Sequence, residues 1–192
     1  MAADTGDPST EARRRVRAAR RALDPADAAG AAQAVADRLG PWITQRWARA
    51  RVGGYVASDG ELDPGPLTRQ LRAAGHSVWL PVCEGDTLRF REWDGDAPLV
   101  EGRWGILEPG AGPTVDGPEL DVILVPLVAF DLDGNRLGRG AGFYDRAFAG
   151  DRRGVLVGLA HDLQELPRWD PEVWDVPLDV VATPTRLLTP SA

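Results

Sequence analysis

The residues best suited to chemistry lie near the middle of the chain, between Val125 and Arg146. An apolar stretch leads there into a loop of alternating glycines, with two arginines in or beside it and an aspartate after it. Glycines let a backbone approach an anion closely, arginines neutralise the anion, and a carboxylate can bind a divalent metal. The residues concerned are Arg136, Gly138, Arg139, Gly140, Gly142, Tyr144 and Asp145. This combination predicts a site for nucleotide phosphates.

The elements that must position this loop alternate between helices and strands. Residues 122–125 and 155–160 are continuous apolar runs, which is typical of parallel strands covered on both faces. Residues 51–57 predict another strand, and the loop after it contains Glu61. Because ligands bind beyond the carboxyl ends of strands in open sheets, we expect the two loops to face one crevice. The predicted fold is α/β, a three-layer and largely parallel Rossmann-like open sheet with helices on both faces.

Local signals predict the remaining boundaries. Residues 1–10 are expected to be a disordered tail, and residues 11–192 a single domain. The second helix begins with the cap and first-turn proline of Asp24-Pro25 and is expected to stop at Gly40-Pro41. The other predicted elements are helices over 11–23 and near 67–74, strands over 77–81 and 87–93 and from Val180, and an irregular loop over 95–117.

Composition limits the functions that the chain can have. The net charge is −7, from 22 basic and 29 acidic residues, which argues against broad nucleic-acid binding. Positive charge is concentrated at residues 13–21, which alone would indicate a solvated helix face, and around the glycine loop. No apolar stretch approaches the ~20 residues of a membrane span. The single cysteine, Cys83, excludes an intrachain disulfide and a cysteine-rich zinc site. We expect a cytoplasmic monomer without a membrane or nucleic-acid partner.

Several familiar motifs fail on their own requirements. Asp131, Asp133 and Asn135 match the start of a calcium-binding EF-hand, but the sixth and twelfth positions are arginine and glycine instead of glycine and glutamate. A tight turn at Asp133-Gly134 is the better interpretation. The glycine loop also lacks the endings of a Walker A motif and of a dinucleotide fingerprint. His76 and His161 have no evident catalytic partner, and we assign them structural roles.

Residues 136–145, Arg-Leu-Gly-Arg-Gly-Ala-Gly-Phe-Tyr-Asp, closely resemble the signature of the 5-formyltetrahydrofolate cyclo-ligase family, also called methenyltetrahydrofolate synthetase. The resemblance covers nearly the whole chain. Its weaker blocks are Arg13-x-x-Val16-Arg17, Asp59-Gly60-Glu61-Leu62, Trp104-Gly105-Ile106-x-Glu108-Pro109 and Asp175-Val176-Pro177-Leu178-Asp179. It implies an enzyme that uses ATP and Mg²⁺ to close 5-formyltetrahydrofolate to 5,10-methenyltetrahydrofolate, releasing ADP and phosphate.

The resemblance also implies a role for individual residues, although several have plain structural readings by themselves. Glu61 could be a surface acid, Trp104 a core residue, and Asp175 to Asp179 a turn. The implied catalytic residues are Arg136, Arg139 and Glu61. The implied ATP-binding residues are Arg13, Arg17, Arg136, Gly138, Arg139, Gly140, Gly142 and Tyr144. The folate is expected to meet Val56, Glu61, Trp104 and Phe143, and the metal Asp145 and Asp179.

Some positions depart from the family pattern. Arg13 replaces a common lysine, Ala141 stands in place of glycine or lysine, and Phe143 replaces a frequent tyrosine. Trp174 and His161 stand where histidine and phenylalanine are common. Two other functions remain open: a folate- or nucleotide-binding protein without turnover, and an ATP-using enzyme for another small anionic substrate. The joint presence of arginines, glycine loop and metal carboxylate favours the cyclo-ligase.

Overall fold

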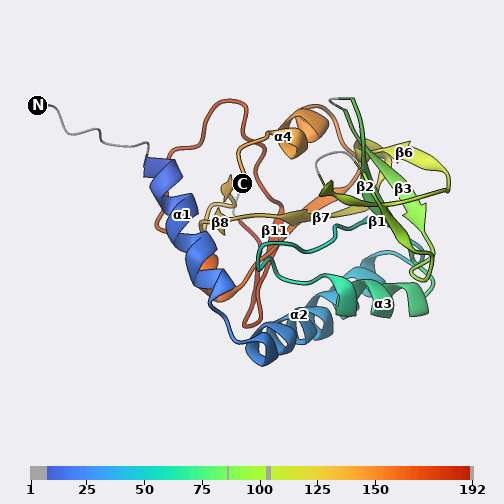
Figure 1. The fold of residues 1–192 in the computed structure, drawn as a ribbon, viewed down its shortest axis with the longest axis horizontal. Coiled ribbons are helices and arrows are strands. Elements are labelled where there is room, and N and C mark those ends of the chain that lie inside the picture. Colours follow the sequence, from blue (N-terminus) through green and yellow to red (C-terminus); the bar gives the residue numbers. More distant parts are fainter. Residues whose placement is uncertain (1–7, 86, 103–104, 191–192) are drawn as a thin grey trace, which may run out of the picture.

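The computed structural model describes residues 8–85, 87–102 and 105–190, and its centre is an eight-stranded sheet with helices on both faces (Figure 1). The helices are α1 (Pro8–Arg21), α2 (Pro25–Arg46), α3 (Gly65–Ala73) and α4 (Phe143–Phe148), with 3-10 turns η2 (Gly117–Glu119) and η3 (Asp162–Gln164). The strands are β1 (Arg51–Gly53), β2 (Ser77–Glu84), β3 (Thr87–Trp93), β4 (Leu99–Glu101), β5 (Leu107–Pro109), β6 (Thr114–Asp116), β7 (Val122–Pro126), β8 (Ala129–Phe130), β9 (Arg136–Leu137), β10 (Val155–Leu159), β11 (Val180–Ala182) and β12 (Leu187–Leu188).

The large sheet is mostly parallel, as predicted. Its strand order is β12-β11-β10-β7-β1-β2-β3-β6. The pairs from β11 through β10, β7 and β1 to β2 are parallel, while β12 at one edge and β3 and β6 at the other are antiparallel. Two small hairpins, β4–β5 and β8–β9, lie outside this sheet. The predicted α/β fold class is confirmed.

Alternate side chains of β7 enter two different hydrophobic layers. Val122 and Leu124 pack with the buried faces of α2 and α3, whereas Ile123 and Val125 pack in the layer that contains Phe148 of α4. Figure 1 shows α2 and α3 below the sheet and α4 above it. A strand covered on both faces needs apolar residues at every position, which explains the continuous apolar run.

Helix α2 does not stop at Gly40-Pro41, contrary to the prediction, but continues to Arg46. A proline inside a helix costs about 3 kcal/mol. Ile43, beyond it, is fully buried, and Trp42 packs on the same core. Burying one large apolar side chain contributes about 1.5–3 kcal/mol, so two of them offset the proline. Gly40 serves close packing, since a Cβ there would lie 2.5 Å from Nε2 of Gln70 on α3.

Other boundaries differ from expectation in smaller ways. Helix α1 already includes residues 8–10, which were expected in the tail, and residues 1–7 lie outside the described part. The strand expected over 51–57 ends at Gly53, after which Tyr55 bonds through its hydroxyl to the Leu62 carbonyl (2.6 Å) and the chain turns. Residues 95–117 contain three short strands instead of an irregular loop only. The division into a tail and one domain stays a prediction.

Within the described residues, no helix combines the length and apolar character that crossing a membrane requires.

Candidate active site

A large cavity lies beyond the carboxyl ends of the parallel strands. Its volume is about 1740 Å³. The segment after β1 contributes residues 55–58 and Glu61, and the segment from β9 into α4 contributes residues 136–146. Both predicted loops therefore face one cavity, as expected from the strand order. A typical small-molecule site has ~300–1,000 Å³, so this cavity has room for two ligands at once.

The glycine loop starts from a tightly fixed hairpin. The Asp131 carboxylate accepts hydrogen bonds from the backbone N–H groups of Asp133 (3.0 Å) and Asn135 (2.9 Å) and from Asn135 Nδ2 (2.9 Å). This is the predicted tight turn at Asp133-Gly134, with Gly134 at φ +83°. The hairpin fixes β9, and the loop that follows takes left-handed conformations at Gly140 (φ +103°) and Gly142 (φ +64°). Only glycine adopts these without steric cost.

Arg136 projects from β9 as a nearly buried cation, only 8% exposed. Its Nη2 pairs with the Asp145 carboxylate, and its guanidinium carbon lies 5.9 Å from the centre of the Tyr144 ring. Its Nε is buried and has no hydrogen-bond partner among the described residues. A buried N–H without an acceptor is costly, so this atom is suited to an anionic oxygen supplied by a ligand.

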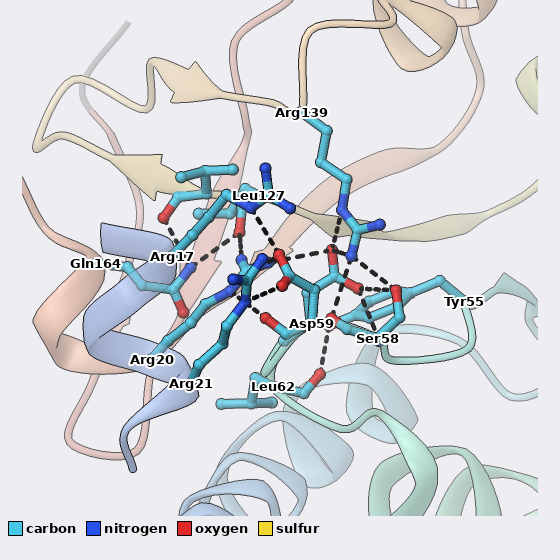
Figure 2. A network of polar contacts seen from close by, with 12 residues as sticks. Arg17, Arg20, Arg21, Tyr55, Ser58, Asp59, Leu62, Leu127, Arg139 and Gln164 are labelled. Carbon is cyan, nitrogen blue, oxygen red and sulfur yellow. Dashed lines mark hydrogen bonds and ion pairs between the residues drawn. The ribbon is translucent and has the colours of Figure 1, made fainter. Parts of the chain in front are cut away.

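Arg139 joins the glycine loop to the loop after β1. It donates from Nε to Oε1 of Glu61 (3.0 Å) and from Nη2 to the Ser58 hydroxyl (2.7 Å) and carbonyl (3.1 Å). Glu61 is held from its other oxygen by the Ser58 backbone N–H (3.1 Å), and its side chain is only 6% exposed. Figure 2 shows Arg139 reaching down to Ser58 in this network. Two predicted catalytic residues therefore touch each other.

The two predicted basic ligands on α1 have different surroundings. Arg13 lines the cavity and donates from Nε to the Gly138 carbonyl (3.0 Å) and from Nη1 to the Ser9 hydroxyl (2.7 Å). Arg17 does not line the cavity, and its Nε pairs with Oδ2 of Asp59 at 2.7 Å. Only Arg13 is placed to meet a ligand in this conformation.

The apolar wall of the cavity includes two of the predicted folate contacts. Val56 follows β1 and Phe143 opens α4, and both line the cavity. The Arg146 guanidinium lies over the Phe143 ring, with its carbon 5.1 Å from the ring centre. Trp104, the third predicted aromatic or apolar contact, lies outside the described residues.

Tyr144 is half-buried at the cavity, where its ring stacks on Phe148 at 6.1 Å between ring centres. Burial, with a further contribution from the charge of Glu61, raises the pKa of its phenol well above the usual value, and Arg136 opposes that shift. The hydroxyl therefore stays neutral at physiological pH and can donate a hydrogen bond.

The two predicted metal carboxylates lie apart. Asp145 lines the cavity, where its Oδ1 also accepts the Val176 backbone N–H at 3.3 Å. Asp179 does not line it, but precedes β11 at the amino end of the parallel strands. Its two oxygens bind Arg152 (2.7 and 3.0 Å) and the Leu156 N–H (2.7 Å). In the described residues, no three acidic, histidine or cysteine side chains are grouped as a metal site.

Both histidines have surroundings that suit a structural role. The Nδ1 atom of His76 accepts the Ala50 backbone N–H at 2.9 Å, which joins the turn between α3 and β2 to the residue before β1. His161 is only 5% exposed and precedes η3. Burial lowers the pKa of both imidazoles, and the charge of Arg20 adds to the shift at His161. Neither histidine lines the cavity.

Sequence reasoning missed one wall of the cavity. The segment between β10 and β11 lines it with a set of aromatic and acidic residues: Trp169, Asp170, Glu172, Trp174 and Asp175. Asp175 opens the predicted Asp175–Asp179 block, but the other four residues carry no motif and belong to no regular element, so only their nearness to that block could have indicated them. Trp174 is 68% exposed although it borders the cavity.

Comparisons with known proteins agree on one family. The family model described as the 5-formyltetrahydrofolate cyclo-ligase family matches residues 7–184. The 5-formyltetrahydrofolate cyclo-ligase of Escherichia coli (strain K12) is 37% identical over 179 residues, which are 90% of this chain and 98% of that protein. A solved 5,10-methenyltetrahydrofolate synthetase from Aquifex aeolicus matches with a TM-score of 0.76 and 28% identity, covering 94% of this chain and 92% of that one.

A second solved 5,10-methenyltetrahydrofolate synthetase, from Mycoplasma pneumoniae, also has a TM-score of 0.76. It covers 93% of this chain and 99% of its own. Its sequence identity is 22%, so this likeness supports the fold alone.

Proposed function

Because the chain belongs to the 5-formyltetrahydrofolate cyclo-ligase family and catalyses the ATP-dependent cyclisation of 5-formyltetrahydrofolate, we propose a role in this reaction for each residue of the cavity described above. The observation that carries the proposal is the contact between Arg139 and Glu61 inside one cavity (3.0 Å). It joins the loop assigned to the nucleotide with the loop assigned to the folate, so a transferable phosphate and its acceptor can lie next to each other.

The chemistry explains why ATP is needed. The N5-formyl group is an amide, and its oxygen is a poor leaving group. That oxygen attacks the γ-phosphorus of ATP, an O–P bond forms, and the bond to ADP breaks. The N10 nitrogen then attacks the formyl carbon and loses its proton, and phosphate leaves with the electrons of the C–O bond. The protein's task is to align the reacting atoms and stabilise the transferring charge.

Arg136 and Arg139 are assigned to the phosphates. The unsatisfied, buried Nε of Arg136 supports this assignment, because an anionic oxygen would complete its hydrogen bonding. Arg139 is 45% exposed at the cavity and can move from Glu61 to a phosphate oxygen. The backbone amides of Gly138, Gly140 and Gly142 would shape the cradle, with Arg13 and the neutral Tyr144 hydroxyl at its sides.

Glu61 is assigned to the reduced pterin of the folate. It is held in place by Ser58 and by Arg139, so it meets a ligand with little remaining freedom. Val56 and Phe143 supply apolar wall to the same cavity. Trp104 keeps its predicted place in this wall from the family resemblance alone.

The residues of the cavity suit Mg²⁺ when it arrives with ATP. Proteins commonly hold this ion through one or two carboxylates together with substrate phosphates. Asp145 would be the first of these carboxylates. Asp175 suits the second position better than Asp179, because it lines the cavity and its neighbour Val176 bonds to Asp145. Bound Mg²⁺ neutralises charge on the phosphates.

The test is a direct assay with purified protein. We expect the methenyl absorbance to rise when 5-formyltetrahydrofolate, ATP and Mg²⁺ are all present, with one ADP released per product. Glu61→Gln should raise KM for the folate, and Arg139→Ala should lower turnover at saturating ATP. Product formation that is unaffected by both changes would contradict the division of work proposed above.

The assembly and location of the protein stay predictions. We infer a monomer in the cytoplasm, acting on its folate and ATP without a nucleic-acid or membrane partner. The support is the sequence alone: no long apolar seam, a single cysteine and an acidic net charge. Sedimentation analysis at micromolar concentration would test the monomer, and a dimer would overturn it.

A further inference from the structure

Arg20 on α1 is buried to an unusual degree for a cation. It is 1% exposed as a residue, and its side chain has no exposed area. Its guanidinium donates from Nε to the Asp59 carbonyl (2.8 Å), from Nη2 to Oδ2 of Asp59 (2.9 Å) and from Nη1 to the Leu127 carbonyl (3.0 Å). Figure 2 shows it at the centre of the network, between α1 and the loop after β1. Such burial calls for a specific reason.

Two of these contacts are shared with other residues. The Asp59 carboxylate also binds Arg17 (2.7 Å) and Arg21. The Leu127 carbonyl also accepts from Nε2 of Gln164 (2.9 Å). If Arg20 were removed, the Asp59 carboxylate and the Leu127 carbonyl would therefore each keep a hydrogen-bond partner. Satisfying these two buried acceptors therefore does not by itself explain why an arginine is buried here.

Two contacts distinguish Arg20 from Arg17 and Arg21 on α1. It bonds to the carbonyl of Asp59, and its Nη2 lies 4.0 Å from Oε1 of Glu61. Asp59 has a left-handed backbone (φ +58°), as does Gly60 (φ +71°). A Cβ on Gly60 would lie 3.1 Å from the Arg20 carbonyl oxygen, so this bend packs directly on α1. The conformation of the bend decides where Glu61 points.

Charge favours the same arrangement. Burial raises the pKa of Asp59, but hydrogen bonds from Arg21, Arg17 and Arg20 outweigh it and leave that pKa well below its usual value. The carboxylate is therefore ionised at any physiological pH and anchors the bend. Arg20 then adds a buried positive charge 4.0 Å from Oε1 of Glu61, the same oxygen that accepts from Nε of Arg139.

We propose that Arg20 is a positioning residue for the folate half of the reaction, holding the Asp59–Gly60 bend so that Glu61 faces the pterin. It touches neither substrate, and it does not line the cavity. The inference rests on the proposed role of Glu61. It adds that α1 serves both substrates: Arg13 contacts the phosphate loop and Arg20 fixes the folate loop.

The experiment compares steady-state kinetics for Arg20→Gln, Arg20→Lys, Glu61→Gln and the double variant Arg20→Gln/Glu61→Gln. Arg21→Gln is the matched control, because Arg21 has a half-exposed side chain and its Nε donates to the carboxylate of Asp59 instead of to its backbone carbonyl. We expect Arg20→Gln to raise KM for 5-formyltetrahydrofolate about tenfold or more, with KM for ATP within about twofold of the parent. Arg20→Lys should recover part of the loss, and Arg21→Gln should behave as the parent.

The double variant decides whether Arg20 acts through Glu61. If it does, Arg20→Gln adds little to the KM of Glu61→Gln, since coupled residues are not additive. Additive effects, equal rises in both KM values, or a lower melting temperature with unchanged kinetics would overturn the proposal. If Arg20→Gln does not fold, Arg20→Lys carries the same comparison. A Glu61→Gln protein with unchanged folate KM would instead refute the role of Glu61, and the inference with it.

Discussion

Arg139 and Glu61 lie 78 positions apart in the sequence and meet at 3.0 Å across the cavity. The pair neutralises the positive charge that Arg139 is proposed to offer to a phosphate and the negative charge that Glu61 is proposed to offer to the pterin. In the proposed division of work, a phosphate that draws Arg139 away would leave Glu61 held by the Ser58 N–H and would free its Oε1 for the folate, so filling one half of the site would prepare the other half. The ion pair also keeps both side chains ordered before either substrate arrives.

Replacing Arg139 by alanine should lower turnover by roughly 10²–10³-fold, the usual effect of losing one donor to transition-state charge. Initial rates of methenyl formation at saturating ATP and folate measure this. Arg14→Ala is the control, since Arg14 is exposed on α1 and pairs with Glu11 at 2.7 Å. Equal turnover in the two variants would exclude Arg139 from the chemistry.

Asp145 and Asp179 should respond differently to the same substitution. Asp145→Asn is expected to raise the Mg²⁺ concentration for half-maximal rate about tenfold, through loss of one charged contact. Asp179→Asn should leave that concentration unchanged and lower the free energy of unfolding by about 1 kcal/mol, because its carboxylate pairs with Arg152. Magnesium titrations and urea unfolding separate the two outcomes, and a reversed pattern would restore Asp179 to the metal site.

His161 should make the protein less stable in mild acid. Burial lowers its pKa, helped by the charge of Arg20 and opposed by Asp162 and by a hydrogen bond with the Gly60 backbone. The folded state therefore binds fewer protons than the unfolded state, whose imidazole titrates near 6.5. The stability linked to this group is complete above that value and is lost as pH falls through the folded pKa.

His161→Phe removes this dependence while filling the same space. The free energy of unfolding, measured in urea between about pH 8 and pH 5, should fall less steeply for the variant than for the parent. Parallel curves for parent and variant would show that His161 titrates equally in both states.

Gly140 should be needed for nucleotide binding more than for folding. Its φ of +103° is unfavourable for alanine, although a Cβ there has no neighbour within 4 Å. Gly140→Ala is expected to reshape the loop and lower kcat/KM for ATP about tenfold, the equivalent of roughly 1–2 kcal/mol of backbone strain. Gly150→Ala, equally uncrowded and without a positive φ, should match the parent. A Gly140→Ala enzyme with normal kcat/KM would contradict the cradle.

The sequence predicted those features that depend on local patterns. Val122 to Val125 indicated a doubly covered strand because every position is apolar, and the structure confirms it. The anion site indicated by Arg136, Arg139 and the glycines stays a prediction, although the structure brings these residues to one cavity. Helix α2 was predicted too short, because local rules count the cost of Pro41 but not the burial of Ile43 beyond it.

Features that depend on distant partners could not be predicted in the same way. Arg17 looks like any solvated arginine until Asp59 is placed beside it, and the pairing of Asp179 depends on Arg152, 27 positions away. The sequence from Trp169 to Asp175 has no helix or strand periodicity. Its place at the cavity depends on the positions of β10 and β11, which the segment connects.

The burial of Arg20 also has a consequence for how the chain is made. Its guanidinium is synthesised 107 positions before the Leu127 carbonyl that it binds. At ribosomal rates of about 5–20 residues per second, it waits in water for roughly 5–20 seconds. This contact of α1 therefore forms only after β7 has been synthesised, long after the helix itself.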